Sequence, residues 1–257
     1  MCLIFISLNN HPAYKLIVAA NRDEFYRRKT APARFWDDYP HILAGRDLEA
    51  GGTWMGINIQ GKISMVTNYR DLRNLKPVAP SRGHLVSDFL LNGDHPQEYG
   101  HKIAAKGEVY NGFNLIFGWP DELLYYSNYT GTVQQIPVGI HGLSNHLLNT
   151  PWPKVEKGKV KFSEEVQSKK IDPNRLFGLL HNEEQALDDQ LPDTGIGIER
   201  ERVLSSMFIK SPDYGTRCST VLLIDRDNNA FFTERVYDLN TFGYTQHEFN
   251  FPIEQPV

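Results

Sequence analysis

Two apolar segments at the start of the chain constrain its fold more than any other feature. The segments CLIFISL (2–8) and YKLIVAAN (14–21) are rich in residues that favour strands. The sequence NNHPA between them has the turn-forming residues of a β-hairpin. Because both segments are too apolar to leave either face fully in water, other parts of the chain must cover both faces of this hairpin.

The rest of the sequence predicts antiparallel strands with two blocks of helices between them. A second hairpin is expected over 53–69 with its turn at Gly61-Lys62, and residues 21–32 are expected to form an exit loop. Further strands are expected at 112–120, 122–129, 132–145, 217–225, 229–238 and 244–251, and helices at 81–93 with Ser81 as N-cap, 95–105, 153–167, 172–182 with Asp172 as N-cap, and 199–208. This segregation predicts an α+β fold with antiparallel sheets and helical outer layers, in a single domain over 1–257.

The charge and the cysteine content narrow the class of function. The formal net charge is −4 and no basic stripe is present, which argues against nucleic acid as a partner. No segment approaches a membrane span, CLIFISL is too short for a secretory signal, and two cysteines give no metal-binding or haem-attachment spacing. We therefore expect a cytoplasmic protein that binds a small-molecule substrate or ligand, with no resident metal or cofactor.

Cys2 is the residue on which the functional interpretation depends. Aminopeptidases remove an initiator Met that precedes a small residue, so the mature chain is expected to begin with Cys2. That residue would then carry both a thiol and a free α-amine, whose ordinary pKa of about 7.7–8.0 lets it act as a base near neutral pH. This combination is the logic of an N-terminal nucleophile. Cys218, inside the apolar RCSTVLLI, is expected to be a core cysteine.

Polar residues at several strand ends are candidates for the rest of a site. Antiparallel pairing of the first two strands brings the tetrad Asn21, Arg22, Asp23 and Glu24 beside Cys2. The other candidates are Asn68, Asn145, Arg217 and Trp54. Each candidate also has a purely structural interpretation. Cys2 could be a buried cysteine, and the tetrad 21–24 could be a polar strand exit with local ion pairs. Asn68 and Asn145 could form turns, Arg217 could be a surface charge, and Trp54 could be a core residue.

These motifs resemble the signature of the NRDE family, which is the transport and Golgi organisation 2 family. The resemblance rests on NRDE (21–24) close behind Met-Cys, with GGTWMGIN (51–58), VTNYRD (66–71), SRG (81–83), GLSN (142–145) and GTRCSTVLL (215–223). It implies the N-terminal nucleophile hydrolase fold, a four-layer αββα sandwich of two antiparallel sheets.

The resemblance also implies roles for the candidate residues. The pattern is similar to that of choloylglycine hydrolase and penicillin V acylase enzymes, which cleave amides with an N-terminal Cys. By motif, Cys2 would be the nucleophile and its amine the base, Asn68 and Asn145 would polarise the oxyanion and substrate, and Arg217 would lie near the thiol. Asn21, Glu24 and Trp54 are candidate substrate contacts.

The pair Arg22 and Asp23 departs from the pattern of those enzymes, whose Arg and Asp are three residues apart. Neighbouring residues of a strand point to opposite faces, so both reach Cys2 only if the strand has already turned.

Two functions follow from these observations. The first is a cysteine N-terminal nucleophile amidohydrolase that acts on the C–N bond of a linear or acyl amide, with Arg22 and Asp23 among its catalytic residues. The second is a non-catalytic protein on the same scaffold that binds and carries haem, acyl-CoA or lipid, because the family has been linked to haem movement and to lipid metabolism.

Overall fold

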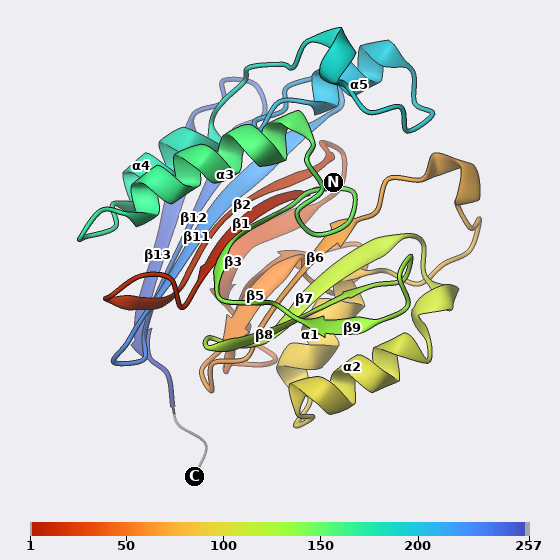
Figure 1. The fold of residues 1–257 in the computed structure, drawn as a ribbon. Helices are drawn as coiled ribbons and strands as arrows, with labels where there is room; N and C mark the ends of the chain where they lie inside the picture. Colours follow the sequence, from red (N-terminus) through yellow and green to blue (C-terminus); the bar gives the residue numbers. More distant parts are fainter. Residues whose placement is uncertain (1, 255–257) are drawn as a thin grey trace.

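Two antiparallel β-sheets form the centre of the computed structural model, which describes residues 2–254 (Figure 1). Over these residues the first sheet has the order β10-β1-β2-β11-β12-β13, formed by β1 (Cys2–Leu8), β2 (Tyr14–Phe25), β10 (Gly139–Leu143), β11 (Tyr214–Asp225), β12 (Asn229–Tyr237) and β13 (Tyr244–Pro252). The second sheet has the order β3-β4-β5-β6-β7-β8-β9, formed by β3 (Thr30–Phe35), β4 (Ile42–Asp47), β5 (Met55–Asn58), β6 (Ile63–Asn68), β7 (Phe113–Trp119), β8 (Glu122–Ser127) and β9 (Val133–Gln135).

Helices cover the outer face of each sheet (Figure 1). The first sheet is covered by α3 (Pro153–Val166) and α4 (Pro173–Leu180), and the second by α1 (Gly83–Leu91) and α2 (Pro96–Ala104). A fifth helix, α5 (Ile198–Leu204), and the short 3-10 helices Leu72–Asn74, Gly107–Val109 and Asp188–Gln190 lie in the connections. The predicted four-layer αββα sandwich of two antiparallel sheets is confirmed.

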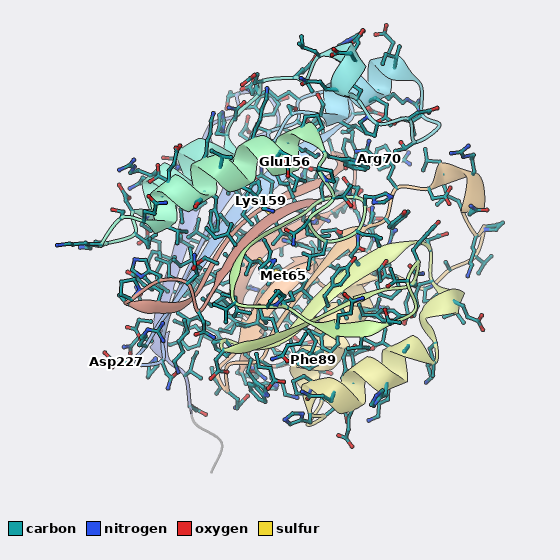
Figure 2. All side chains as sticks on the ribbon, viewed as in Figure 1. Met65, Arg70, Phe89, Glu156, Lys159 and Asp227 are labelled. Atoms are coloured by element: carbon teal, nitrogen blue, oxygen red, sulfur yellow. The ribbon has the colours of Figure 1, made fainter. Side chains whose placement is uncertain are left out.

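Three apolar clusters fill the spaces between the four layers. Along β1, Ile4 and Ile6 point into the cluster between the sheets, whereas Leu3 and Phe5 point into the cluster beneath α3 and α4. A third cluster lies between the second sheet and its helices. Figure 2 shows Met65 between the two sheets and Phe89 on α1. Both faces of the first hairpin are therefore buried, as its composition predicts.

The largest difference from the sequence expectations lies at 21–32. Strand β2 continues through Phe25 instead of ending in a loop, because β11 pairs with it as far as Tyr214 opposite Phe25. This pairing gives the backbone of the polar tetrad hydrogen-bond partners that sequence periodicity cannot indicate. The chain then continues into β3 and β4, which the sequence did not predict.

Two other expectations were wrong in detail. The segment 132–145 divides between the sheets, with β9 pairing β8 in the second sheet and β10 pairing β1 in the first. Helix α1 begins at Gly83 after Arg82, so Ser81 is not the N-cap and its Oγ instead accepts a hydrogen bond from the Gly83 amide. The Asp172 cap of α4 is confirmed, since its side chain accepts from the Asn174 amide at 2.9 Å.

Helix α3 approaches strand β1 closely because it carries Gly158 where the two elements meet. A Cβ atom at this position would lie 2.0 Å from Cζ of Phe5. Phe5 also stacks on Phe162, with ring centroids 5.8 Å apart, so its ring contacts α3 at two positions one turn apart. The absence of a side chain at Gly158 therefore sets the distance between the helical layer and the first sheet.

We predict that Gly158→Ala destabilises the protein by about 1–3 kcal/mol, because the added methyl group overpacks against Phe5. Gly178→Ala in α4 is the matched control, since a Cβ there meets nothing within 4 Å. That substitution should stabilise the helix by up to about 1 kcal/mol through helix propensity alone. Denaturant unfolding of both variants measures the difference, and equal free energies of unfolding would contradict the close approach.

Candidate active site

Strand pairing places Cys2 beside Arg22. Cys2 lies directly opposite Arg22 in the pairing of β1 with β2, and Arg22 lies directly opposite Cys218 in the pairing of β2 with β11. Directly opposite residues share a face of a sheet, so these three side chains point toward the second sheet. The two cysteines are free and are separated by strand β2, about 9–10 Å for two strand spacings, which is beyond the reach of a disulfide.

A cavity of about 500 Å³ opens at Cys2, and we call it the Cys2 cavity. Its walls come from the ends of β1, β2 and β6, from the segment 47–54, and from the segment 79–84 that leads into α1. Five of the predicted residues other than Cys2 line it: Arg22, Asp23, Glu24, Asn68 and Trp54. A volume of this size suits a small organic ligand.

Arg22 is a buried cation on one wall of the Cys2 cavity. Its side chain is 6% exposed, its guanidinium lies 4.1 Å from the ring centroid of Trp54, and Glu24 lies 3.8 Å away. The Trp54 ring packs directly on Gly45 of β4, where a Cβ would approach to 2.3 Å. Within residues 2–254, Nη1 of Arg22 has no hydrogen-bond partner. The guanidinium is thus held by stacking and retains unused hydrogen-bonding capacity.

Asn21 faces away from the Cys2 cavity, which corrects its expected role as a substrate contact. Its Nδ2 donates to the carbonyls of Leu180 and Met207, both at 2.9 Å, and its Oδ1 accepts from Ser219. The reason is the alternation of side chains along a strand that does not turn at this point. Asn21 therefore ties β2 to the layer that contains α4.

Asp23 lies at the same end of β2 and borders the Cys2 cavity, but its carboxylate is on the helical side of the sheet. It accepts a hydrogen bond from Oγ1 of Thr216 at 2.7 Å and is 1% exposed. The strand has not turned at 22–23, so Arg22 and Asp23 approach Cys2 from opposite faces. The two groups do not act side by side.

Arg217 is the extra residue of a β-bulge and does not line the Cys2 cavity. Thr216 pairs with Asp23 and Cys218 pairs with Arg22, which leaves Arg217 unmatched. Its Nη1 donates to the carbonyls of Phe25, Tyr26 and Arg28 at 2.9–3.2 Å. The expectation that this guanidinium lies near the thiol is therefore corrected: it fastens the turn after β2, because the bulge re-aims its side chain.

The two predicted asparagines have different positions. Asn68 ends β6 and lines the Cys2 cavity. Asn145 is fully buried, and its Nδ2 donates to the backbone carbonyl of Asn68 at 3.0 Å. Its own carbonyl accepts from the Arg70 amide at 2.7 Å. Asn145 therefore does not line the cavity and instead fixes the end of β6 that presents Asn68.

Burial sets the protonation of the groups around Cys2. It raises the pKa of the Cys2 thiol, while Arg22 and a backbone hydrogen bond from Asp23 act in the opposite direction. Burial also raises the pKa of Asp23, and the nearby Lys154 is the largest opposing influence. Lys154 is 3% exposed, donates to the Leu204 carbonyl at 2.9 Å, and has its pKa lowered by burial to about 8. The resting thiol therefore carries its proton.

Several residues at the site were not predicted. Arg28 and Asp47 form a charged pair in the cavity wall, with Nη2 and Oδ2 2.6 Å apart, and Arg82 lines the cavity from the segment that leads into α1. Arg28 belongs to the densest basic cluster of the sequence and Arg82 to the quoted SRG motif, so both had a weak signal. Lys154 had none, because nothing in its local sequence indicates burial of the first turn of α3.

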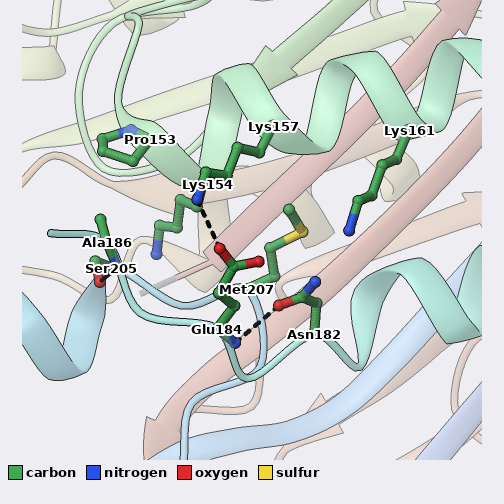
Figure 3. Close-up of a pocket in the computed structure, with 9 residues that line it drawn as sticks. All are labelled: Pro153, Lys154, Lys157, Lys161, Asn182, Glu184, Ala186, Ser205 and Met207. Carbon is green, nitrogen blue, oxygen red and sulfur yellow. Dashed lines mark hydrogen bonds and ion pairs between the residues drawn. The ribbon is translucent and has the colours of Figure 1, made fainter. Parts of the chain in front are cut away.

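A second hollow lies beside α3 and is separate from Cys2 (Figure 3). It holds only about 10 Å³, room for about one water molecule, beneath the ion pair of Lys157 with Glu184. Among residues 2–254 no three His, Cys, Asp or Glu side chains are grouped so as to hold a metal ion. In the same range no helix has the length and apolar character needed to cross a membrane.

Comparisons with known proteins agree with this architecture. Residues 1–239 match the family model for Transport and Golgi organisation 2. The chain is 40% identical to the Transport and Golgi organization protein 2 homolog of Bos taurus, over 97% of this chain and 99% of that protein, and 37% identical to the Mus musculus homolog, over 99% and 100%. Among solved structures, a mutant conjugated bile acid hydrolase from Clostridium perfringens aligns with a TM-score of 0.54 at 7% identity, over 100% and 99% of the two chains. The predicted N-terminal nucleophile hydrolase fold is confirmed.

Glu234 is a buried carboxyl group that joins the two sheets behind Arg22. It lies on β12, is 1% exposed, and accepts a hydrogen bond from the Ala33 amide of β3 at 2.7 Å. Burial raises its pKa from 4.5 to about 7. The folded chain therefore keeps a proton that the unfolded chain releases from about pH 4.5, so this group stabilises the fold at low pH and that contribution is lost as the pH rises through 7.

We predict that Glu234→Gln removes this pH dependence. Between pH 5 and pH 8, the free energy of unfolding of the variant relative to that of the unsubstituted protein should rise by about 2–3 kcal/mol, because the amide is never charged. Urea unfolding at several pH values gives the comparison. Glu248→Gln, an exposed position on β13, is the control and should show no such trend. Parallel stability curves for the Glu234 variant and the unsubstituted protein would show that this carboxyl does not titrate near pH 7.

Proposed function

The chain belongs to the Transport and Golgi organisation 2 family, and from the geometry around Cys2 we propose that it is an N-terminal nucleophile amidohydrolase. The observation that supports this most directly is the strand register that sets Cys2 against Arg22 at the mouth of a 500 Å³ cavity. The fold shared with a protein named as a conjugated bile acid hydrolase supplies the scaffold, while the support for the reaction comes from these residues. The substrate is a linear or acyl amide.

In the proposed reaction, removal of Met1 frees the α-amine of Cys2. The amine takes the thiol proton, and the sulfur forms a bond to the carbonyl carbon of the amide. The side chain of Asn68, which lines the cavity, donates to the oxygen that becomes negative. As the C–N bond breaks, the ammonium returns its proton to the leaving amine. Water then gives a proton to the α-amine and attacks the thioester, and the C–S bond breaks to restore the thiol.

The protonation of the site is suited to this order of events. Burial raises the pKa of the Cys2 thiol, so the sulfur keeps its proton until the amine on the same residue accepts it. The Arg22 guanidinium then stabilises the thiolate as it forms. We assign Asp23 the role of acceptor that orients the α-amine, because its buried carboxylate lies one residue beyond the partner of Cys2 on β2.

The proposal predicts that hydrolysis requires Cys2 to be the first residue. The protein is made with an N-terminal extension that a specific protease can remove so that Cys2 becomes the first residue. While the extension is present, turnover of N-acyl amides should be lower by at least about 10³-fold, because the nitrogen of Cys2 is part of a peptide bond and cannot act as a base. Cleavage should restore activity in the same sample, and intact mass measures the state of the terminus. Cys2→Ala should stay inactive after cleavage, whereas Cys218→Ala should recover. Equal turnover before and after cleavage would rule out this mechanism.

A carrier of haem or acyl-CoA is the second candidate function, favoured by the opposite orientation of Arg22 and Asp23. These two side chains do not form the side-by-side pair that a hydrolase of this pattern is expected to need. A carrier would use the Cys2 cavity for non-covalent binding alone.

The carrier function predicts saturable binding that survives Cys2→Ala. Haem titration followed by visible absorption and acyl-CoA titration by calorimetry measure this. Because the cavity volume is set by the ends of the two sheets, the Kd of the Cys2→Ala variant should stay within about threefold of the unsubstituted protein. No binding of either ligand would remove the carrier from consideration.

A further inference from the structure

The three arginines that line the Cys2 cavity differ in how their charges are compensated. Arg28 donates from Nε and Nη2 to Oδ2 of Asp47 at 2.9 and 2.6 Å. Arg22 has Glu24 at 3.8 Å. Arg82 donates from Nη1 to the Gly112 carbonyl at 3.0 Å, and no carboxylate of residues 2–254 lies within ion-pair distance of it. Arg82 is thus the cavity-lining cation with no acidic partner in the described chain.

The position of Arg82 is fixed by close backbone packing at the start of α1. The Gly83 carbonyl accepts from the Thr53 amide at 3.2 Å, and a Cβ at Gly52 would lie 2.6 Å from the Gly83 carbonyl carbon. His84 adds a hydrogen bond between Nε2 and the Ala50 carbonyl at 2.6 Å. These contacts hold the first residues of α1 against the segment 50–53, so the backbone that carries Arg82 has a fixed position at the cavity.

The environment of Arg82 strengthens its attraction for an anion. The side chain is half-buried, and its burial lowers its pKa, while the charge of Glu24 acts in the opposite direction. A guanidinium has five N–H donors, of which the Gly112 carbonyl engages one group. Hydrogen bonds from a partly desolvated guanidinium to a carboxylate or phosphate are short and strong.

The carboxylates of the Cys2 cavity do not cancel this attraction. Asp47 is engaged by Arg28, and Glu24 lies between Arg22 and Arg28 at 3.8 and 3.9 Å. Asp23 has its carboxylate on the helical side of the first sheet, bonded to Thr216. Arg22 contributes a second cation on the same cavity, with its buried Nη1 unpartnered within the described residues.

We propose that Arg82 is the specificity-determining residue of the Cys2 cavity and selects ligands that carry an oxyanion, a carboxylate or a phosphate. The inference rests on the Cys2 cavity being the ligand site of the proposed function, and it narrows the ligand to an anionic amide. Its binding step does not require that the amide is cleaved.

The competition between two alkylating reagents at Cys2 tests this directly. Iodoacetate and iodoacetamide differ only in a carboxylate against a carboxamide, and both alkylate the thiol with loss of iodide. We define the ratio as the rate of Cys2 alkylation by iodoacetate divided by the rate with iodoacetamide, measured by peptide mass spectrometry at fixed ionic strength. This ratio should be about tenfold higher in the folded protein than in the urea-unfolded chain. Arg82→Gln should remove most of this tenfold difference, with the remainder due to Arg22, and Arg82→Lys should retain a larger part of it.

Two controls separate the anion site from general effects. Arg46→Gln removes the same charge from a residue that is bonded to Asp38 outside the cavity, and it should leave the ratio unchanged. Protection of the buried Cys218 in every variant shows that the fold is intact. A ratio equal to that of the unfolded chain, a ratio that Arg82→Gln leaves unchanged, or failure of both reagents to label Cys2 would overturn the proposal. None of these readouts requires amide hydrolysis, so failure of the catalytic proposal is seen separately.

The source of the oxyanion is distinguished by protection of Cys2 from iodoacetamide. N-acetylglycine, inorganic phosphate and the neutral N-acetylglycinamide are compared at equal ionic strength. Protection by N-acetylglycine alone identifies a carboxylate, protection by phosphate alone identifies a phosphate, and protection by both supports a general oxyanion site. Protection by N-acetylglycinamide equal to that by N-acetylglycine, or no protection by either anion, contradicts the proposal.

Discussion

The antiparallel pairing of β2 with both β1 and β11 is the constraint on which the rest of the site depends. It fixes Cys2, Arg22 and Cys218 in one row across three strands and on the face toward the second sheet. Because hydrogen bonds of the ladder hold each residue in register, a shift by a single position would move Arg22 to the helical side. The apolar cluster between the sheets resists such a shift, since it requires Ile4, Val18 and Ala20 to stay on the inner face.

Several polar residues that the family motifs contain act on the backbone around the Cys2 cavity instead of lining it. Asn145 holds the end of β6, Arg217 holds the turn after β2, and Asn21 holds β2 against the helical layer. Each of them donates to backbone carbonyl groups at the ends of strands or helices or in the connections between them. The shape of the cavity therefore depends on side chains that do not line it.

Placing charged groups at the ends of two packed sheets has an energetic cost. Arg22, Asp23, Lys154 and Glu234 are all at least nine-tenths buried. Arg22 stacks on Trp54 and has Glu24 at 3.8 Å, and the charges of Asp23 and Lys154 act on each other. Glu234 accepts a hydrogen bond from the Ala33 amide. Leaving water costs a charged group several kcal/mol unless its partners are well placed. Such groups are typical of a site whose chemistry or binding requires charge in a desolvated space.

The amino-acid sequence alone predicts the layers and the first hairpin, because periodic apolar residues and turn residues are local signals. It also brought the tetrad 21–24 to Cys2, since antiparallel strands must meet start to end. Which members of that tetrad face the cavity depends instead on strand pairing between distant parts of the chain. Pairing with β11, some 190 residues later, extended β2 through Phe25 and sent Arg22 and Asp23 to opposite faces. The bulge at Arg217, the burial of Lys154 and the uncompensated charge of Arg82 were likewise not predictable, because each depends on contacts with segments that are distant in the sequence.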